Sequence, residues 1–233
     1  YAEIKALATG NPYIREKMDL DIQVSKLKLM KANHTSQKYH LETDIAKNYP
    51  VQIAAQKEQI AGLRADREAV KPILEEKEKD NFSMMIGGKT YTDRKEAGTA
   101  ILAACAGLKA VKSNGQIGEF HGFSLNASYD SFYQTYKLTI KRQCSYQIEI
   151  GKDVLGNLQR ISNALTGIEK RLTEAEQKME NLLSQLATAQ EEVEKPFPKE
   201  AELTEKMERL AELNSLLNMD EKGTSEALGM GED

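Results

Sequence analysis

Tryptophan is absent from the 233-residue chain, and phenylalanine and tyrosine make up only 6% of it. A large globular core normally contains many bulky aromatic side chains, so this scarcity argues against one large compact domain. The chain is instead rich in Glu, Lys, Gln, Ala and Leu, and 29% of its residues are charged. Such a composition is typical of long helices and coiled coils. The sequence therefore predicts that much of its length is extended helix.

Cysteine and long apolar runs are also scarce. The two cysteines, Cys105 and Cys144, are far apart in the sequence, so neither a disulfide framework nor a Cys-x-x-Cys metal site is predicted. No stretch approaches the ~18 apolar residues of a membrane span, and no signal-peptide pattern is present. These absences predict a soluble cytoplasmic protein with no membrane partner. The chain begins at Tyr1 rather than Met and ends in "GTSEALGMGED", so we expect a piece cut from a longer protein.

The clearest periodic signal lies between residues 154 and 193. Apolar residues recur there in alternating steps of four and three, at Val154, Leu158, Ile161, Leu165, Ile168, Leu172, Ala175, Met179, Leu182, Leu186, Ala189 and Val193. This is the a/d pattern of a coiled coil, here called the 154–193 seam, and it requires a partner helix. Residues 153–195 are therefore predicted as one descending helix. Prolines 196 and 198 end it, and an amphipathic helix over 196–219 and a flexible tail over 220–233 follow.

The partner helix is predicted at the other end of the chain. Residues 1–80 form an exit segment and then a helix with a drifting apolar stripe. We therefore expect an α+β fold, in which a long antiparallel coiled coil carries a small head, residues 81–152, inserted at its tip. Pro50 and Pro72 predict kinks or breaks in the ascending helix, near Tyr49 and Lys71. The stripe also shifts by one residue near Pro50, which supports a break there.

The head has the pattern of a small sheet with one helix. β-Branched and aromatic segments predict two strands, then a helix that starts at a capping box of Asp93 and Glu96, then three or four strands. The segment "GGKT" at 87–90 matches the end of a nucleotide-binding P-loop, but Ser83 occupies the position where that motif needs glycine. Gly87 and Gly88 are therefore predicted to form a two-residue hairpin turn. The sheet is expected to be antiparallel, with the helix on one face.

The sequence offers no convergent set of catalytic groups. His34 and His40 are six residues apart on a predicted helix, so they cannot share a metal on one face. His121, in the predicted strand "EFHGF", makes at most a surface pair with Glu119. No catalytic residue, cofactor-binding residue or metal ligand is predicted.

The charge distribution of the head is more informative. Residues 81–152 contain nine basic and five acidic side chains, a net charge of +4 in a chain of net charge −4. Together with nearby tyrosines, such a surface suits phosphates and bases. The alternative is a solvated strand face with the tyrosines packed in a small core, because +4 is modest beside dedicated DNA-binding domains. The candidate nucleic-acid contacts are Lys137, Lys141, Arg142, Lys109 and Lys112.

Several longer stretches carry a resemblance to a known family. They include "YAEIKALATGNPYIREKMDLDIQVSKLKLMKA", "GGKTYTDRKEAG", "GEFHGF", "GNLQRISNAL" and "EVEKPFPKEAELTEKMERLAELNSLLNMDE". In this order they resemble the C-terminal region of the large Swi/Snf-type helicase and adenine DNA methyltransferase proteins of bacterial phages, plasmids and integrative elements. The resemblance covers nearly the entire chain. It implies a bacterial parent protein that uses ATP and S-adenosylmethionine to move on DNA and to methylate it or protect it from restriction.

The family's catalytic motifs do not fall within these residues. The helicase P-loop, its acidic metal-binding motif and the methyltransferase Asn-Pro-Pro-aromatic motif have no match in the sequence, so no catalytic residue is carried over. The sequence therefore predicts a non-catalytic arm and head that contact DNA or other domains of the parent chain. The alternative is a structural module for protein interaction, such as a homodimer formed through the coiled coil.

Overall fold

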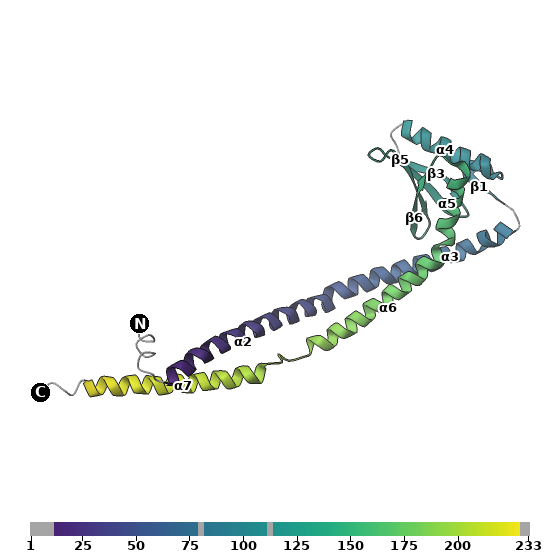
Figure 1. The fold of residues 1–233 in the computed structure, drawn as a ribbon. Coiled ribbons are helices and arrows are strands. Elements are labelled where there is room, and N and C mark those ends of the chain that lie inside the picture. Colours follow the sequence, from purple (N-terminus) through teal and green to yellow (C-terminus); the bar gives the residue numbers. More distant parts are fainter. Residues whose placement is uncertain (1–11, 79–81, 111–113, 229–233) are drawn as a thin grey trace. The chain divides into compact units, whose positions relative to one another are not determined.

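The computed structural model describes residues 12–78, 82–110 and 114–228. It is an α+β protein whose strands form one six-stranded antiparallel sheet. The chain divides into two compact units, one formed by residues 1–49 and 185–233 and the other by residues 50–184 (Figure 1). The predicted exit segment at 1–11 and the end of the predicted tail at 229–233 lie outside the described residues. None of the described helices is long and apolar enough to cross a membrane.

The first unit contains a pair of antiparallel helices, α2 (Pro12–Thr43) and α7 (Glu200–Leu228). Val24 and Leu27 of α2 are buried against Leu203 of α7. Polar contacts run in opposite order along the two helices: Glu16 with Arg209, Gln23 with Lys206, and Lys31 with Glu200. This reversed order makes the pair antiparallel, as the sequence predicted. Helix α7 continues to Leu228, further than the predicted end at 219.

A π-helix, η1 (Asp44–Asn48), replaces the break predicted near Tyr49. Thr43 and Tyr49 both keep helical backbone angles, and the Tyr49 N–H bonds to the carbonyl of Asp44, five residues earlier. A π turn accommodates one additional residue in a helix, which accounts for the one-residue shift of the apolar stripe. Helix α3 (Tyr49–Glu78) continues directly from η1, and Pro50, its second residue, has no N–H to donate to the preceding turn. It also continues past Pro72, so the helix does not break near Lys71 either.

The second unit contains the sheet. Its strands are β1 (Met84–Ile86), β2 (Lys89–Tyr91), β3 (Gly115–Phe120), β4 (Phe123–Asp130), β5 (Thr135–Lys141) and β6 (Ser145–Ile150), in the order β2-β1-β3-β4-β5-β6. Helix α4 (Arg94–Ala110) lies between β2 and β3 in sequence, and α5 (Val154–Thr166) follows β6. Two strands, a helix and four strands follow one another, as predicted.

Local signals in the head are confirmed. Gly87 and Gly88 form the β1–β2 turn with φ of 56° and 78°, the left-handed region that glycine reaches without a Cβ clash. A hairpin therefore occupies the site of the partial P-loop motif. Asp93 precedes α4, and its carboxylate accepts the Glu96 N–H at 2.8 Å, the first half of the expected capping box. His121, expected in a strand, lies in the β3–β4 turn with a φ of 50°.

Among the described residues, helices cover one face of the sheet and leave the other open. Leu125, Leu138 and Ile140 are fully buried on that face, and α4 packs on β1, β3 and β4 while α5 packs on α4 and β6. The other face presents polar side chains, among them Lys137 and Lys141, which alternate with the buried residues of β5. The alternation predicted for "YKLTIKR" is therefore confirmed, as is a one-faced antiparallel sheet.

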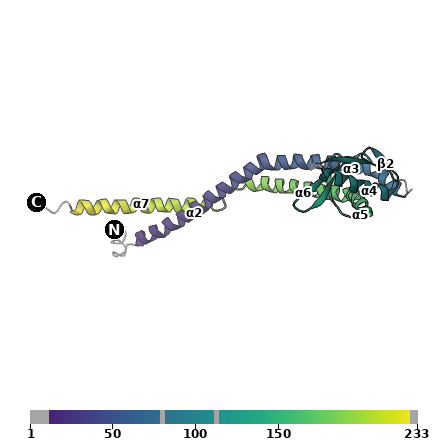
Figure 2. The ribbon, with the colours of Figure 1, turned by 90° about the horizontal axis from the view of Figure 1, so that it is seen from above.

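The 154–193 seam is divided between two helices. Helix α5 ends at Thr166, Gly167 follows with φ −74° and ψ −3°, and α6 (Ile168–Val193) begins after it, so the prediction of one uninterrupted helix is wrong. All twelve positions of the seam are nevertheless buried or half-buried. Those on α5 pack in the head, whereas Leu172 and Ala175 of α6 share a core with Ile60 and Leu63 of α3. Both views show α3 and the first part of α6 side by side (Figures 1 and 2).

Candidate functional site

The β5–β6 turn, residues 142–144, is fastened to α3 by one buried carboxylate. Asp66 is fully buried. Its oxygens accept the backbone N–H groups of Gln143 at 3.0 Å and Cys144 at 2.8 Å, and the Tyr146 hydroxyl at 2.7 Å. Arg142 donates to the Ala65 carbonyl at 2.9 Å and brings its guanidinium to 3.9 Å from Asp66. A buried charge is tolerated when its lone pairs are satisfied in this way.

The position of Asp66 within an apolar stripe is a signal that the sequence already contains. Leu63 and Val70 are both buried on α3, and Asp66 lies between them on the same side of the helix. A carboxylate within an apolar stripe must meet donors in the folded protein. The donors come from a turn almost eighty residues away in sequence, so the sequence alone does not identify them.

Close packing at this junction raises the pKa values of two titratable groups. A Cβ added to Gly62 would lie 2.8 Å from the Cys144 Sγ, so glycine allows the turn to approach α3. Burial, and then the Asp66 charge, raise the pKa of the Cys144 thiol. Burial and the hydrogen bond to Asp66 likewise raise the pKa of the Tyr146 hydroxyl. Both groups are protonated at neutral pH, and a protonated thiol is a poor nucleophile.

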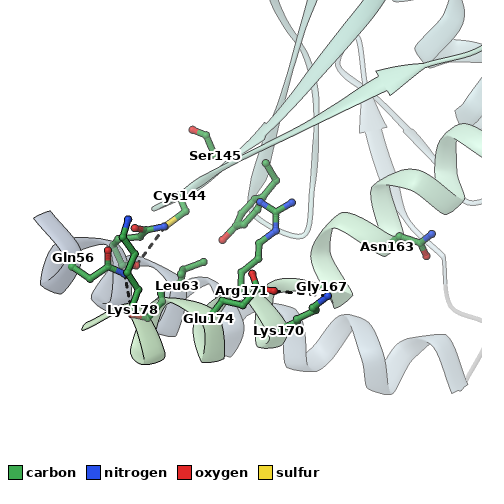
Figure 3. A pocket seen from close by; sticks show the side chains of 13 residues that line it. Gln56, Leu63, Cys144, Ser145, Asn163, Gly167, Lys170, Arg171, Glu174 and Lys178 are labelled. Carbon is green, nitrogen blue, oxygen red and sulfur yellow. Dashed lines mark hydrogen bonds and ion pairs between the residues drawn. The ribbon is translucent and has the colours of Figure 1, made fainter. Parts of the chain in front are cut away.

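A groove of about 560 Å³ lies beside this turn (Figure 3). Its wall consists of residues from α3, the start of β6, the end of α5 and the first half of α6. The polar and charged side chains that line it are Gln56, Gln59, Cys144, Ser145, Tyr146, Asn163, Lys170, Arg171, Glu174 and Lys178.

The groove carries an excess of positive charge. Three basic side chains line it, Lys170, Arg171 and Lys178, together with one carboxylate, Glu174, so its net charge is +2. The Arg171 guanidinium lies 5.3 Å from the centroid of the Tyr146 ring, a cation–π arrangement that leaves its N–H donors available. Neither Arg171 nor Lys178 forms an ion pair with a carboxylate of the described residues, whereas Lys170 lies 3.8 Å from Glu174.

The structure describes four of the five predicted contact residues and does not bring them together. Lys137 and Lys141 share the open face of the sheet, but Lys137 is paired with Asp130 at 2.9 Å and lies opposite Glu149 on β6. That pairing with Asp130 raises the pKa of Lys137. Lys141 is exposed and lies opposite Ser145, which lines the groove.

Lys109 and Arg142 point elsewhere. Lys109, at the end of α4, lies 4.3 Å from the Tyr129 ring centroid, and a hydrogen bond with Tyr129 raises its pKa. Arg142 points toward α3, and Lys112 lies outside the described residues. Sequence reasoning missed Lys170, Arg171 and Lys178, because it treated α6 only as part of a coiled coil.

Two further findings bear on function. Among the described residues, no three His, Cys, Asp or Glu side chains come together as a group able to hold a metal ion. Comparison with protein-family models, curated proteins and solved structures finds no match to the chain. The groove, with a net charge of +2, is more cationic than the cavity lined by Arg67, Lys71 and Glu169 and the cavity lined by Lys89, Asp93, Lys95 and Glu96.

Proposed function

We propose that this chain is a non-catalytic part of a DNA-processing protein and that the groove beside the β5–β6 turn binds the phosphate backbone of DNA. The observation that carries this proposal is the presence of Arg171 and Lys178 in the groove without carboxylate partners. A guanidinium presents several N–H donors in a planar fork that matches a phosphate group. An unpaired cation near the surface attracts phosphate through counterion release.

Lys141 extends the positive surface beyond the groove. It lies opposite Ser145, at the edge of the groove. Lys137 is farther along β5, and its charge is offset by Asp130. We therefore assign a larger share of DNA binding to Lys141 and Arg171 than to Lys137, which revises the ranking inferred from the sequence.

The parent protein is proposed from the resemblance described above. In this proposal the chain is the C-terminal arm and head of a bacterial helicase and DNA methyltransferase, located in the cytoplasm, and ATP and S-adenosylmethionine are bound by other domains. The antiparallel α2–α7 pair and the packing of α6 on α3 favour a helical arm of the coiled-coil type.

The proposal is tested by DNA binding to the 233-residue chain. Fluorescence anisotropy with labelled DNA at ~50 mM salt should show binding that weakens steeply toward ~200 mM salt. Arg171→Ala combined with Lys178→Ala should weaken binding to all sequences about equally and reduce the salt slope by about one to two. A matched control, Arg15→Ala with Lys28→Ala, removes the same charge from exposed positions of α2 and should have little effect. Equal effects of the two double variants would show that the groove is not the contact.

The residues predicted from sequence give a second test. Lys137→Ala with Lys141→Ala should also weaken binding without unfolding the head, because Leu138 and Ile140 keep the apolar face intact. Measured singly, Lys141→Ala should have the larger effect. A larger effect of Lys137→Ala would place the contact on the open sheet face rather than in the groove.

A homodimer is the second candidate, and one observation favours it. Ile22 and Leu29 of α2 are 68% and 63% exposed and lie one heptad apart on the same side of the helix. If they form a dimer seam, Ile22→Asp with Leu29→Asp should convert a dimer to a monomer in sedimentation equilibrium. A monomeric wild-type chain would exclude this candidate.

A further inference from the structure

The β4–β5 turn exposes two aromatic rings. Phe132 is 84% exposed and Tyr133 is 68% exposed. Their ring centroids are 4.9 Å apart in an edge-to-face arrangement. Single exposed apolar side chains are common on protein surfaces, but two adjacent rings at the end of a hairpin form a distinct apolar surface.

The turn holds these rings in place. The Asp130 carboxylate accepts the backbone N–H groups of both Phe132 and Tyr133 at 3.1 Å, and its other oxygen pairs with Lys137. Gln134 completes the turn with a φ of 52°. The Lys137 Nζ also lies 5.9 Å from the centroid of the Tyr133 ring. The exposed rings therefore belong to a hydrogen-bonded turn.

The size of this surface indicates what it contacts. Two aromatic side chains bury about 300–500 Å² at most, less than the ~800 Å² per partner of a stable protein interface. The neighbouring side chains Ser131, Gln134 and Lys137 are polar or charged. Nucleobases need only a flat apolar ring for stacking and a cation near the phosphate.

We propose that Phe132 and Tyr133 stack on unpaired bases of a DNA strand and give the head a preference for single-stranded DNA over duplex. This inference rests on the proposed function, because the groove is taken to bind the backbone of the same strand. The groove and the turn belong to the same unit, at opposite ends of β5. Six residue steps from Thr135 to Lys141 separate the two ends by about 20 Å, a distance that a short single strand can span.

The test compares single-stranded and duplex DNA. Phe132→Ala with Tyr133→Ala should weaken binding of the chain to labelled oligo-dT by roughly 5- to 150-fold for each stacked base lost, while duplex affinity is unchanged. Tyr39→Ala is the matched control, because Tyr39 is also 68% exposed but belongs to the other unit. It should leave both affinities unchanged.

Stacking has a direct optical signal in this protein. The chain has no tryptophan, so Phe132→Trp introduces a single reporter that preserves an aromatic ring at the turn. Its fluorescence should be quenched when oligo-dT binds and should not change with duplex DNA. Tyr39→Trp should show no quenching with either DNA.

The outcomes separate the two proposals. If wild-type protein binds no DNA at ~50 mM salt, where phosphate contacts are strong, both fail. If the groove variants weaken binding but the turn variants do not, stacking is wrong and the groove proposal stands. Equal weakening of single-stranded and duplex binding by the turn variants would refute the preference for unpaired bases. A change in oligomeric state with Phe132→Ala and Tyr133→Ala would identify the turn as a self-association surface instead.

Discussion

Asp66→Ala is expected to release the β5–β6 turn from α3. The substitution removes a fully buried acceptor and leaves the N–H groups of Gln143 and Cys144 and the Tyr146 hydroxyl without their partner. Each buried donor left unsatisfied costs ~1–3 kcal/mol. Relief of the buried charge offsets part of this loss, so we expect the junction to be destabilised by about 3–5 kcal/mol.

Graded variants separate the contributions. Tyr146→Phe removes one of the three donors and should cost about 1 kcal/mol. Asp66→Asn keeps one acceptor oxygen but turns an NH₂ group toward at least one donor, so its effect should fall between those of Tyr146→Phe and Asp66→Ala. Asp19→Ala, at an exposed position of α2, is the control and should be neutral.

Hydrogen exchange is the appropriate assay, because a chain of two units need not unfold in one two-state transition. A loss of 3 kcal/mol or more should accelerate exchange of the Gln143 and Cys144 amides by at least about 100-fold, while the amides of β3 and β4 change less. Acceleration below about tenfold at both amides would mean that Asp66 does not hold the turn. Equal acceleration throughout the sheet would mean that Asp66 supports the whole head rather than this junction.

Four other expectations can be checked on the same chain. Leu172→Asp, at a side chain only 2% exposed, should destabilise the second unit by several kcal/mol. Thr173→Asp, on the exposed side of α6, is the control and should not destabilise it. Equal thermal melting curves for the two variants would contradict the packing described for α6. Gly88→Val forces a β-branched residue to a φ of 78° and should destabilise the β1–β2 hairpin by about 1–3 kcal/mol. Lys89→Ala should leave ATP binding at background in equilibrium dialysis. Saturable ATP binding that Lys89→Ala abolishes would restore the P-loop interpretation. Burial raises the pKa of Cys105 from 9.0 to about 11. The contribution of the buried, protonated Cys105 thiol to the free energy of unfolding is therefore complete below pH 9 and is lost as pH rises toward 11. Cys105→Ala should flatten this part of the stability–pH curve measured by urea unfolding.

Local signals in the head were sufficient to predict its elements. The pair Gly87-Gly88 has a strong preference for positive φ, and Asp93 supplies an N-cap, so each feature depends on residues close in sequence. Period-two alternation in "YKLTIKR" likewise placed Lys137 and Lys141 on the polar face. These features survive in the structure because no tertiary contact opposes them.

The helices were predicted less accurately, because an apolar stripe shows that a face is buried but not what covers it. The seam positions on α5 pack in the head, whereas Leu172 and Ala175 on α6 pack with residues of α3, yet all of them read as one heptad pattern. A shift of one residue near Pro50 also fits either a break or a π turn, and the backbone adopts the π turn, in which the Tyr49 N–H still bonds to the carbonyl of Asp44.

The sequence by itself determined the order of the elements, the hairpin turn and the cap of α4, because turn chemistry and periodicity act over a few residues. Only the tertiary structure decided which charged groups meet. Asp66 is joined to a turn almost eighty residues later, and Arg171 lies over the ring of Tyr146. The candidate groove depends on these distant contacts, because side chains from α3, β6 and α6 form it together and no local pattern specifies that arrangement.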